Sequence, residues 1–382
     1  MINPAERKKI LIISLTDQDS DPRILRQISF LKDPYDIYCC GLTNSVIGND
    51  KFIKAGLKKN SVFSKIVIGT LKLMRLFSAA EKFFLNYKLS IDSEMEKPLF
   101  DLIIANDMDT VPAAFRFFRS KKVMADLHEF TQSEFDDRFY FRYIHKNYVI
   151  YECRKYFPEL NAVTTVCRSI ADEYRKQYSV NPAVITNASE FEKLTPGGVG
   201  EKIRIIHHGA AIRSRKIELM IETAELLDER FTLDLMLIPN EPDYFSYLKD
   251  LAAESTNVNM IDPVKYRNIV RFCNSYDIGI FILPPTNLNY KYALPNKFFE
   301  FIQSRLAVIT GPSEEMSDYI NRYELGISTD SFNPSQIAAE INKLSKEQIY
   351  NYKLNSDKYA FELSAETNRK ILTDIVKNLT EK

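Results

Sequence analysis

Residues 277–311, DIGIFILPPTNLNYKYALPNKFFEFIQSRLAVITG, alternate between two hydrophobic patterns. The runs DIGIFIL (277–283) and LAVITG (306–311) are short, apolar and rich in β-branched residues, as buried strands are. Between them, YALPNKFFEF (292–301) has helical spacing, and Pro295 suits a first turn because its φ is preset and it lacks an N–H. A strand, a helix and a second strand in this order predict a parallel sheet with helices on its faces.

The same alternation extends over the rest of the chain. In the second half we expect further strands at 203–210 and 231–238 and further helices at 215–227 and 264–276. In the first half the expected strands are 8–15, 35–42, 100–107, 121–130, 161–167 and 182–188, and the expected helical segments are 22–32, 62–89, 110–120 and 169–178. The fold class is therefore α/β, with two doubly wound, Rossmann-like domains.

Length and glycine usage predict where the domains divide. The chain has 382 residues, more than the roughly 250–300 at which a single core stops growing. Three of its 11 glycines gather in NASEFEKLTPGGVGEK, which is typical of a linker. We expect an N-terminal domain at 1–186, a linker at 187–202, a C-terminal domain at 203–350 and a helical, polar-rich tail at 351–382.

Composition excludes several classes of partner. Acidic and basic residues balance at 51 each, so net charge gives no reason to expect nucleic acid. The five cysteines have neither zinc-site nor disulfide spacing, which favours a reducing compartment. The start MINPAERKKILIISL resembles neither a signal peptide nor a membrane span, and no Gly-rich dinucleotide fingerprint or P-loop occurs. We expect a cytoplasmic protein.

The helix that begins at Pro295 lacks a cap of its own. Leu294 has no side-chain oxygen, and Asn296 is the only nearby candidate to satisfy the first amides. Such a helix start binds anions, and Lys297 adds a positive charge. Glu300, one turn further, can accept two hydrogen bonds from a vicinal diol such as that of a ribose. The alternative is an ordinary helix with a surface ion pair between Lys297 and Glu300.

A second basic cluster follows the expected strand at 203–210. Gly209 allows a ligand to approach the backbone closely. Arg213, Arg215 and Lys216 come at the next helix start, where arginines and backbone amides together bind anions. The alternative is a solvated basic turn.

Polar residues also follow the strands of the first half, at the sheet edge where doubly wound folds bind ligands. Asp21 and Arg23 lie at a helix start, where Asp21 could equally be a cap. Asp107 follows the strand at 100–107, and His128 follows the next, where it could equally be a structural hydrogen-bonding residue. D-x-D patterns in TDQDSDPR and DMD are weak signals for a metal.

The central segment YALPNKFFEFIQSRLAVITG resembles the P-N-K-x-x-E-[YF] segment of retaining GT-B glycosyltransferases of family 4. Further segments resemble successive parts of that family in the same order: DSDPRILRQISFL, LIIANDMDTVPAA, DLHEF, AVTTVCRSIADEY, VITNA, HHGAAIRSRKIELMIETAELL and YDIGIFIL. The resemblance implies a GT-B fold, in which two Rossmann-like domains face an interdomain cleft and the last helix packs back toward the first domain. It also implies that a sugar passes from a nucleotide-diphosphate sugar to a saccharide or lipid-linked acceptor with retention.

The family's residue roles transfer by position. Glu300 matches the residue that holds the donor ribose, Gly209 lies at the nucleotide edge, and His128 resembles a histidine that reaches toward the transferred sugar. The implied catalytic residues are His128, Arg215 and Lys297; the donor-binding residues are Gly209, Arg213, Lys216, Asn296 and Glu300; the acceptor-side residues are Asp21, Arg23 and Asp107. Since GT-B enzymes stabilise the leaving diphosphate with cations and amides, no metal and no cofactor are expected.

Two departures from the family pattern leave alternatives open. Tyr292 stands where a second glutamate is usual, and Ala210 stands where an arginine usually follows the glycine. A non-catalytic homologue that acts as a binding partner and a GT-B-like nucleotide-sugar epimerase are therefore the alternatives to a transferase.

Basic, aromatic segments at 64–84 and 137–157 predict a peripheral membrane contact, at the inner face of the membrane. The alternative for both is a core-facing helix with solvated lysines. With a membrane contact, the resemblance favours a role in cell-surface polysaccharide or glycolipid synthesis.

Overall fold

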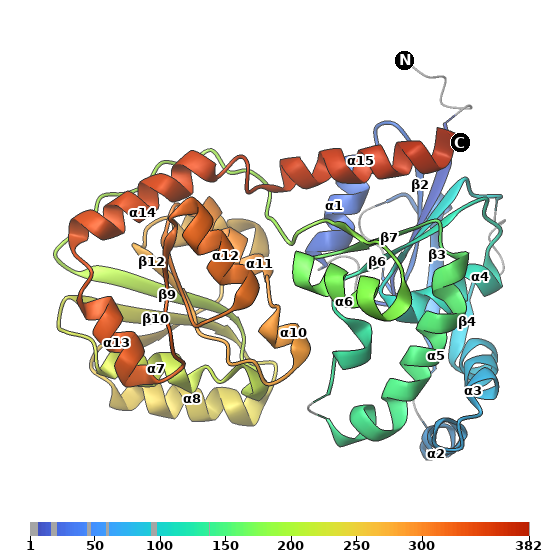
Figure 1. The fold of residues 1–382 in the computed structure, drawn as a ribbon, viewed down its shortest axis with the longest axis horizontal. Coiled ribbons are helices and arrows are strands. Elements are labelled where there is room, and N and C mark those ends of the chain that lie inside the picture. Colours follow the sequence, from blue (N-terminus) through green and yellow to red (C-terminus); the bar gives the residue numbers. More distant parts are fainter. Residues whose placement is uncertain are drawn as a thin grey trace. The chain divides into compact units, whose positions relative to one another are not determined.

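The computed structural model describes residues 7–16, 21–43, 47–58, 61–92, 98–136 and 138–381, with Asn49 described by its backbone only. Asp17 and Asp19 of the first D-x-D pattern and Asp137 of the second basic segment lie outside these ranges. The chain divides into two compact units (Figure 1). Unit 1 comprises Met1–Thr186 and Arg369–Lys382, and unit 2 comprises Asn187–Asn368.

Unit 1 is built on one sheet with the strand order β4-β3-β2-β1-β5-β6-β7-β8. Its strands are β1 (Lys9–Ile13), β2 (Asp36–Gly41), β3 (Phe52–Leu57), β4 (Leu89–Ile91), β5 (Leu102–Asn106), β6 (Val123–Leu127), β7 (Ala162–Thr165) and β8 (Ala183–Val184). All neighbours pair in parallel except β3 and β4, which are antiparallel. The central strands β1 and β5 are almost wholly buried, as their continuous apolar sequences predict.

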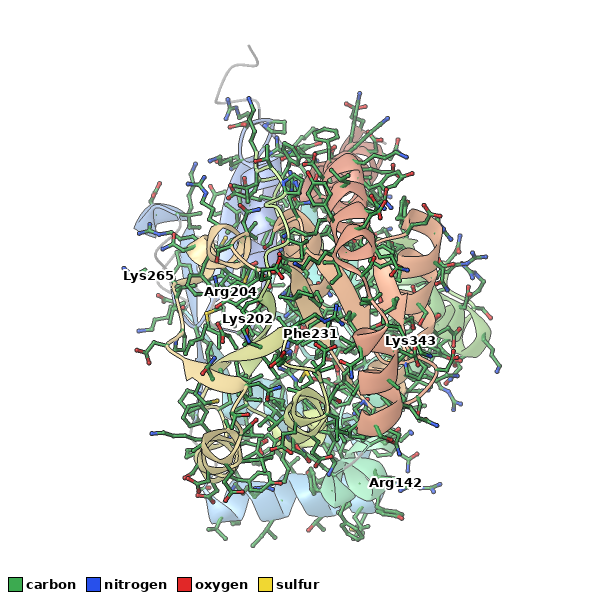
Figure 2. The ribbon with its side chains drawn as sticks, turned by 90° about the vertical axis from the view of Figure 1, so that its left-hand side faces the viewer. Arg142, Lys202, Arg204, Phe231, Lys265 and Lys343 are labelled. Carbon is green, nitrogen blue, oxygen red and sulfur yellow. The ribbon has the colours of Figure 1, made fainter. Side chains whose placement is uncertain are left out.

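The helices of unit 1 follow its strands in the expected alternation. They are α1 (Pro22–Leu31), α2 (Val62–Leu73), α3 (Phe77–Phe83), α4 (Val111–Phe117), α5 (Lys146–Tyr156) and α6 (Arg168–Tyr178), with π-helical turns η3 (Phe84–Lys88) and η6 (Phe141–His145). The expected helical region at 62–89 is broken, because Arg75 has a φ of 59° after α2 and the segment ends in β4. Figure 2 shows α2 at the lower end of the view, beside the segment that carries Arg142.

Unit 2 has a fully parallel sheet with the order β11-β10-β9-β12-β13-β14. Its strands are β9 (Ile203–Ala210), β10 (Phe231–Ile238), β11 (Val258–Ile261), β12 (Ile278–Phe281), β13 (Ala307–Thr310) and β14 (Gly326–Ser328). Its helices are α7 (Glu218–Glu225), α8 (Pro242–Glu254), α9 (Ile269–Cys273), α10 (Leu288–Lys291), α11 (Asn296–Gln303), α12 (Glu314–Tyr323), α13 (Pro334–Asn342) and α14 (Lys346–Tyr359). This order is that of a doubly wound fold, whose direction reverses between β9 and β12.

Helix α11 is held inside unit 2. Every residue from Lys297 to Gln303 is buried, which is unusual for a helix that carries a lysine and a glutamate. Phe301 lies flat against β12, where a Cβ on Gly279 would come within 2.3 Å of its ring. The bulky aromatic and the glycine therefore fit together as a pair and fix the position of the helix on the sheet.

Two helices end the chain. In α14, Lys353 donates hydrogen bonds to the carbonyl of Tyr276 and the carboxylate of Asp277, at 2.8 and 3.0 Å, so unit 2 continues beyond residue 350. Within α15 (Ala365–Glu381), the Arg369 guanidinium lies 4.9 Å from the Phe30 ring of unit 1. Among the described residues, no helix has both the length and the apolar character needed to cross a bilayer.

Candidate functional site

The residues of interest in unit 2 meet where its sheet reverses direction. Gly209 lies near the end of β9, Phe281 ends β12, and α11 follows β12 after one loop and the short α10. In doubly wound sheets ligands bind at this crevice, outside the carboxyl ends of the strands.

The start of α11 presents uncapped amides. The residue before the helix is Pro295, with φ −80° and ψ 162°, and within the described part of the chain the helix has no side-chain cap. The sequence placed Pro295 inside that turn; it lies one position earlier because its ψ is extended, and Asn296 is the first helical residue. The Oδ1 atom of Asn296 is buried and has no hydrogen-bond partner among the described residues. A helix end with orphan donors and no cap is a ready anion site.

Lys297 is the least satisfied side chain of the site. It is only 8 % exposed, and its Nζ has no hydrogen-bond partner within the described part of the chain. The Nζ lies 4.3 Å from the centre of the Phe281 ring. Burial, together with the nearby Arg215 charge, holds the pKa of Lys297 well below its ordinary value. A buried amine without a hydrogen-bond partner among the described residues is costly, so this position favours the arrival of an anion.

Gly209 makes room for that ammonium. Its φ of 133° lies in the region that side chains rarely adopt. A Cβ at this position would come within 2.9 Å of Lys297 Nζ and 4.0 Å of Arg215 Nη1. Gly209, Lys297 and Arg215 thus form one basic cluster at the end of β9.

The other two basic residues of the turn point elsewhere. The sequence placed a helix start at 215, but residues Arg213–Arg215 form a 3₁₀ turn and α7 begins at Glu218. The Arg213 guanidinium lies 4.9 Å from the Tyr244 ring, and Lys216 Nζ lies 3.7 Å from Glu218. Of the three candidates, Arg215 is the one that the structure brings to Gly209 and Lys297.

Glu300 lies one turn into α11 and is 4 % exposed. Its carboxylate is 3.4 Å from Nε2 of His208, the residue before Gly209. Burial, with the Lys297 charge, lowers the pKa of His208 to about 3, so the imidazole is neutral and this contact is not an ion pair. Because Lys297 and Glu300 are both buried, the alternative of a surface ion pair between them is excluded. Sequence reasoning missed His208, although its place at a strand end beside Gly209 could have identified it.

Tyr292, at the position of the family's second glutamate, is buried at the end of α10. The Nζ of Lys291 lies 4.9 Å from its ring centre. This position therefore offers a phenol in place of a carboxylate.

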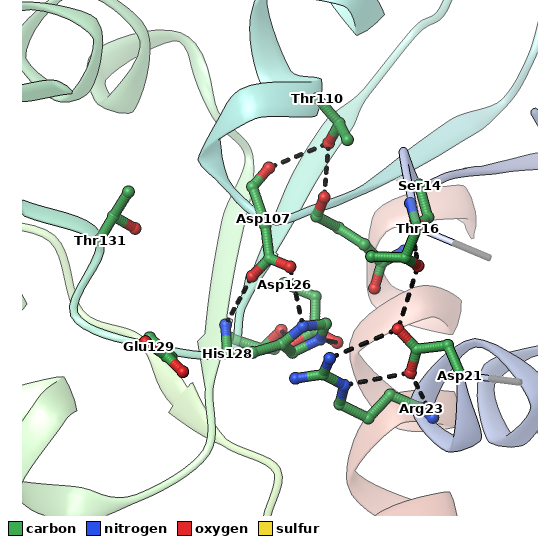
Figure 3. Close-up of polar contacts among 12 residues, drawn as sticks. Ser14, Thr16, Asp21, Arg23, Asp107, Thr110, Asp126, His128, Glu129 and Thr131 are labelled. Atoms are coloured by element: carbon green, nitrogen blue, oxygen red, sulfur yellow. Dashed lines mark hydrogen bonds and ion pairs between the residues drawn. The ribbon is translucent and has the colours of Figure 1, made fainter. Parts of the chain in front are cut away.

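In unit 1, His128 lies between two carboxylates (Figure 3). Its Nδ1 is 3.2 Å from Asp107 and its Nε2 is 3.2 Å from Asp126, and its backbone N–H donates to Asp107 at 3.1 Å. Gln27 donates to the same Asp126 carboxylate at 2.6 Å and to Asn106 at 2.8 Å. Asp107 has a φ of 63°, a strained backbone conformation of the kind that clusters at functional sites.

The two carboxylates decide the charge of His128. Burial alone would lower its pKa, but Asp107 and Asp126 outweigh burial and raise it from 6.5 to about 9. The side chain is therefore an imidazolium whose two N–H groups point at carboxylates. In the structure His128 is a buried, charged residue that forms hydrogen bonds within unit 1. Its contact with a transferred sugar is a proposal.

We expect the His128 network to make stability pH-dependent. The pKa of His128 is about 9 in the folded protein and 6.5 in the unfolded chain, so its protonation stabilises the folded state. This contribution is complete below pH 6.5 and is lost as the pH rises through about 9. The loss should be roughly 3 kcal/mol, measured as the fall in unfolding free energy in urea. The variant His128→Gln should lack this fall, and an equal fall in both proteins would contradict the assignment.

Asp21 caps α1 and also holds Arg23. Its carboxylate accepts from the Arg23 backbone N–H at 3.0 Å and from Arg23 Nε at 3.2 Å, while the Thr16 hydroxyl donates to it at 3.1 Å. The capping alternative is thus realised, and the cap in addition orients a guanidinium toward His128 and Asp107. The sequence candidates Asp21, Arg23, Asp107 and His128 lie together.

A cavity of about 510 Å³ opens beside this cluster, within unit 1. Arg23, Asp107 and His128 form one part of its wall. The remainder mixes apolar residues with charged ones. The apolar ones include Ile68 of α2, Phe84 of η3, Phe141 of η6 and Val149 of α5, and the charged ones include Lys72, Glu134 and Glu152. Its size is that of a small-molecule site.

Within the ranges that the structure describes, no three His, Cys, Asp or Glu side chains are grouped so as to hold a metal ion. The carboxylate of Asp107, in the DMD pattern, is directed at His128.

No family model matches the chain, and no curated protein matches its sequence. Solved structures match its fold. HepE of Anabaena, solved with UDP-glucose, superposes with a TM-score of 0.67 at 12% identity over 98% of this chain and 100% of its own. A glycosyltransferase from Rickettsia africae superposes with a TM-score of 0.66 at 12% identity, over 98% of this chain and 99% of its own.

TarM of S. aureus, solved with fondaparinux, alpha-GlcNAc-glycerol and UDP, gives a TM-score of 0.58 at 15% identity. The match covers 74% of this chain and 55% of TarM, so the chain spans about half the length of that protein. Together these similarities show the fold class predicted from the sequence, the two Rossmann-like sheets of GT-B glycosyltransferases.

Proposed function

We propose that this chain is a glycosyltransferase that binds a nucleotide-diphosphate sugar in unit 2 and transfers the sugar to an acceptor bound in unit 1. The observation that carries the proposal is the Lys297 amine, which has no hydrogen-bond partner among the described residues and is buried beside Gly209 and Arg215 at the uncapped start of α11. Glu300 follows one turn later. A diphosphate at the helix start and a ribose diol at Glu300 satisfy both features at once.

In this proposal the residues of unit 2 act mainly by electrostatics. Arg215, Lys297 and the first amides of α11 stabilise the charge that develops on the leaving diphosphate, in place of a metal ion. Asn296, with an unsatisfied Oδ1, is positioned to contact the donor as well. Arg213 and Lys216 would reach the phosphates only after leaving Tyr244 and Glu218.

Transfer with retention is the finer proposal. The acceptor hydroxyl attacks the anomeric carbon on the face from which the diphosphate departs, the bond from carbon to phosphate oxygen breaks, and the hydroxyl proton passes to that oxygen. No residue of this chain has been assigned as a nucleophile. Asp21, Arg23 and Asp107 would line the acceptor side, and the charged His128 would orient hydroxyl groups there.

The acceptor is proposed to be a saccharide or a lipid-linked saccharide, in polysaccharide or glycolipid synthesis at the inner face of the membrane. The cavity of unit 1 supports an amphiphilic acceptor, because it joins charged groups to an apolar wall.

A thermal-shift screen against UDP-, GDP-, ADP- and TDP-sugars tests the proposal. A ligand at 100 times its dissociation constant should add about 2.7 kcal/mol of stability. Nucleotide release that depends on an acceptor supports transfer. Interconversion of the sugar would instead identify an epimerase, and binding without turnover a non-catalytic partner. Stabilisation by no nucleotide-sugar would contradict the donor site itself.

A further inference from the structure

Helix α2 has its apolar side turned outward. Val62, Phe63, Ile66 and Leu73 are exposed, and Phe63 is 72 % accessible. The opposite side of the helix, with Ile68 and Lys72, lines the cavity of unit 1. Surface helices of globular proteins normally turn their apolar stripe to the core, so this inverted arrangement calls for an external partner.

A second element continues the same surface. In the segment that leads into and through η6, Phe139, Tyr140 and Tyr143 are exposed, with Phe139 75 % accessible. The rings of Phe139 and Tyr143 contact each other at 4.8 Å between centres. Contacts join η6 to α2, and both lie at the lower end of the view in Figure 2, where Arg142 is labelled. We call these seven exposed apolar and aromatic residues of α2 and η6 the α2–η6 face.

Exposed basic residues flank the α2–η6 face, and the half-buried Asp136 also lies before its η6 part. Lys65 and Arg75 are exposed next to its α2 part, and Arg138 and Arg142 are exposed next to its η6 part. The sequence from 61 to 80 contains no aspartate or glutamate. Like charge disfavours a second copy of this chain as the occupant, whereas apolar side chains rimmed by cations and aromatic rings match an anionic bilayer surface.

We propose that the α2–η6 face docks on an anionic lipid bilayer, with its apolar side chains in the headgroup region and its basic residues against lipid phosphates. The same two elements supply Ile68, Lys72, Phe141 and His145 to the cavity wall on their inner side. The role of docking rests on the proposed function: a protein docked by this face would hold its cavity next to a lipid-linked acceptor.

Vesicle sedimentation tests the docking. The full chain should sediment with vesicles of phosphatidylcholine and phosphatidylglycerol, and much less with phosphatidylcholine alone. The variant Lys65→Glu/Arg75→Glu/Arg142→Glu should lower the partition coefficient by at least ~100-fold, since each basic residue contributes about fivefold. The variant Phe63→Ser/Ile66→Ser/Phe139→Ser should lower the partition coefficient by at least ~100-fold on both kinds of vesicle, because apolar burial is lost.

A control variant removes three exposed apolar side chains elsewhere. Leu226→Ser/Tyr350→Ser/Leu354→Ser, all exposed in unit 2, should sediment as the wild type does. Equal vesicle binding of the wild type and the α2–η6 variants would overturn the inference. A wild-type dimer in light scattering that becomes a monomer in the serine variant would overturn it as well. UDP binding of the wild type, measured in parallel, tests the proposed function separately. A wild-type protein that binds UDP but no vesicle overturns docking alone, and one that binds anionic vesicles but no UDP overturns the donor site alone.

Discussion

Replacing Lys297 by methionine should weaken nucleotide binding strongly and leave the protein at least as stable as the wild type. Methionine keeps most of the unbranched apolar side chain while it removes the amine, which lies 4.3 Å from the centre of the Phe281 ring and has no hydrogen-bond partner among the described residues. The unfolding free energy should hold or rise, because a buried amine without a hydrogen-bond partner among the described residues is removed. Affinity for UDP should fall by about 3 kcal/mol, roughly 100-fold, measured by titration calorimetry.

Lys216→Met is the control for charge. It removes an exposed lysine from the same turn as Arg215, so UDP affinity should change by less than about twofold, as exposed charges contribute little. Calorimetry in buffers of different ionisation enthalpy gives a second readout. Because the pKa of Lys297 is depressed, a bound diphosphate should raise it, and the wild type should take up protons that Lys297→Met does not. A marked loss of stability in Lys297→Met would show that the ammonium has a structural role.

Replacing Glu300 by alanine should separate ribose recognition from phosphate recognition. The variant loses the carboxylate expected to accept two hydrogen bonds from the ribose diol, and UDP affinity should fall by about 3 kcal/mol, roughly 100-fold. Affinity for inorganic pyrophosphate should change little, because Lys297, Arg215 and the α11 amides remain. The protein should stay folded, with its thermal transition retained.

The comparison variant is Glu314→Ala, which removes an exposed carboxylate at the start of the next helix. It should bind UDP and pyrophosphate as the wild type does. Unchanged UDP affinity in Glu300→Ala would count against the assigned role, and a parallel loss for pyrophosphate would mean that the substitution had disturbed α11 itself.

The central unit of the fold could be predicted because its periodicity is unambiguous. The expected strand, helix and strand within 277–311 correspond to β12, α11 and β13. The helix start was misplaced by one residue, since proline is compatible with both the capping position and the first turn. Elements such as α8 and β11 were not among the expected ones, and β4 was taken as helix because the apolar run before it continues without a breaker.

The candidate sites were predictable where position along a strand decides them. Gly209, Arg215, Lys297 and Glu300 follow strands that end at the same edge, and the structure brings them together. Arg213 and Lys216 could not be told from Arg215, because a left-handed backbone at Lys216, with φ 54°, sets the directions of the turn. Asp126 completes the His128 network, but from the sequence it is an ordinary residue within a strand. Its role in the network follows only from its contact with His128 in the structure.

The fit of Gly209 against Lys297 makes the two positions differ in what they tolerate. A side chain at 209 would press on the flexible lysine tip and would also have to adopt a φ of 133°, so glycine is favoured there whatever residue stands at 297. A shorter residue at 297 meets no such obstacle, so the lysine can be exchanged without a second change at 209, whereas exchange of the glycine strains the backbone in either case.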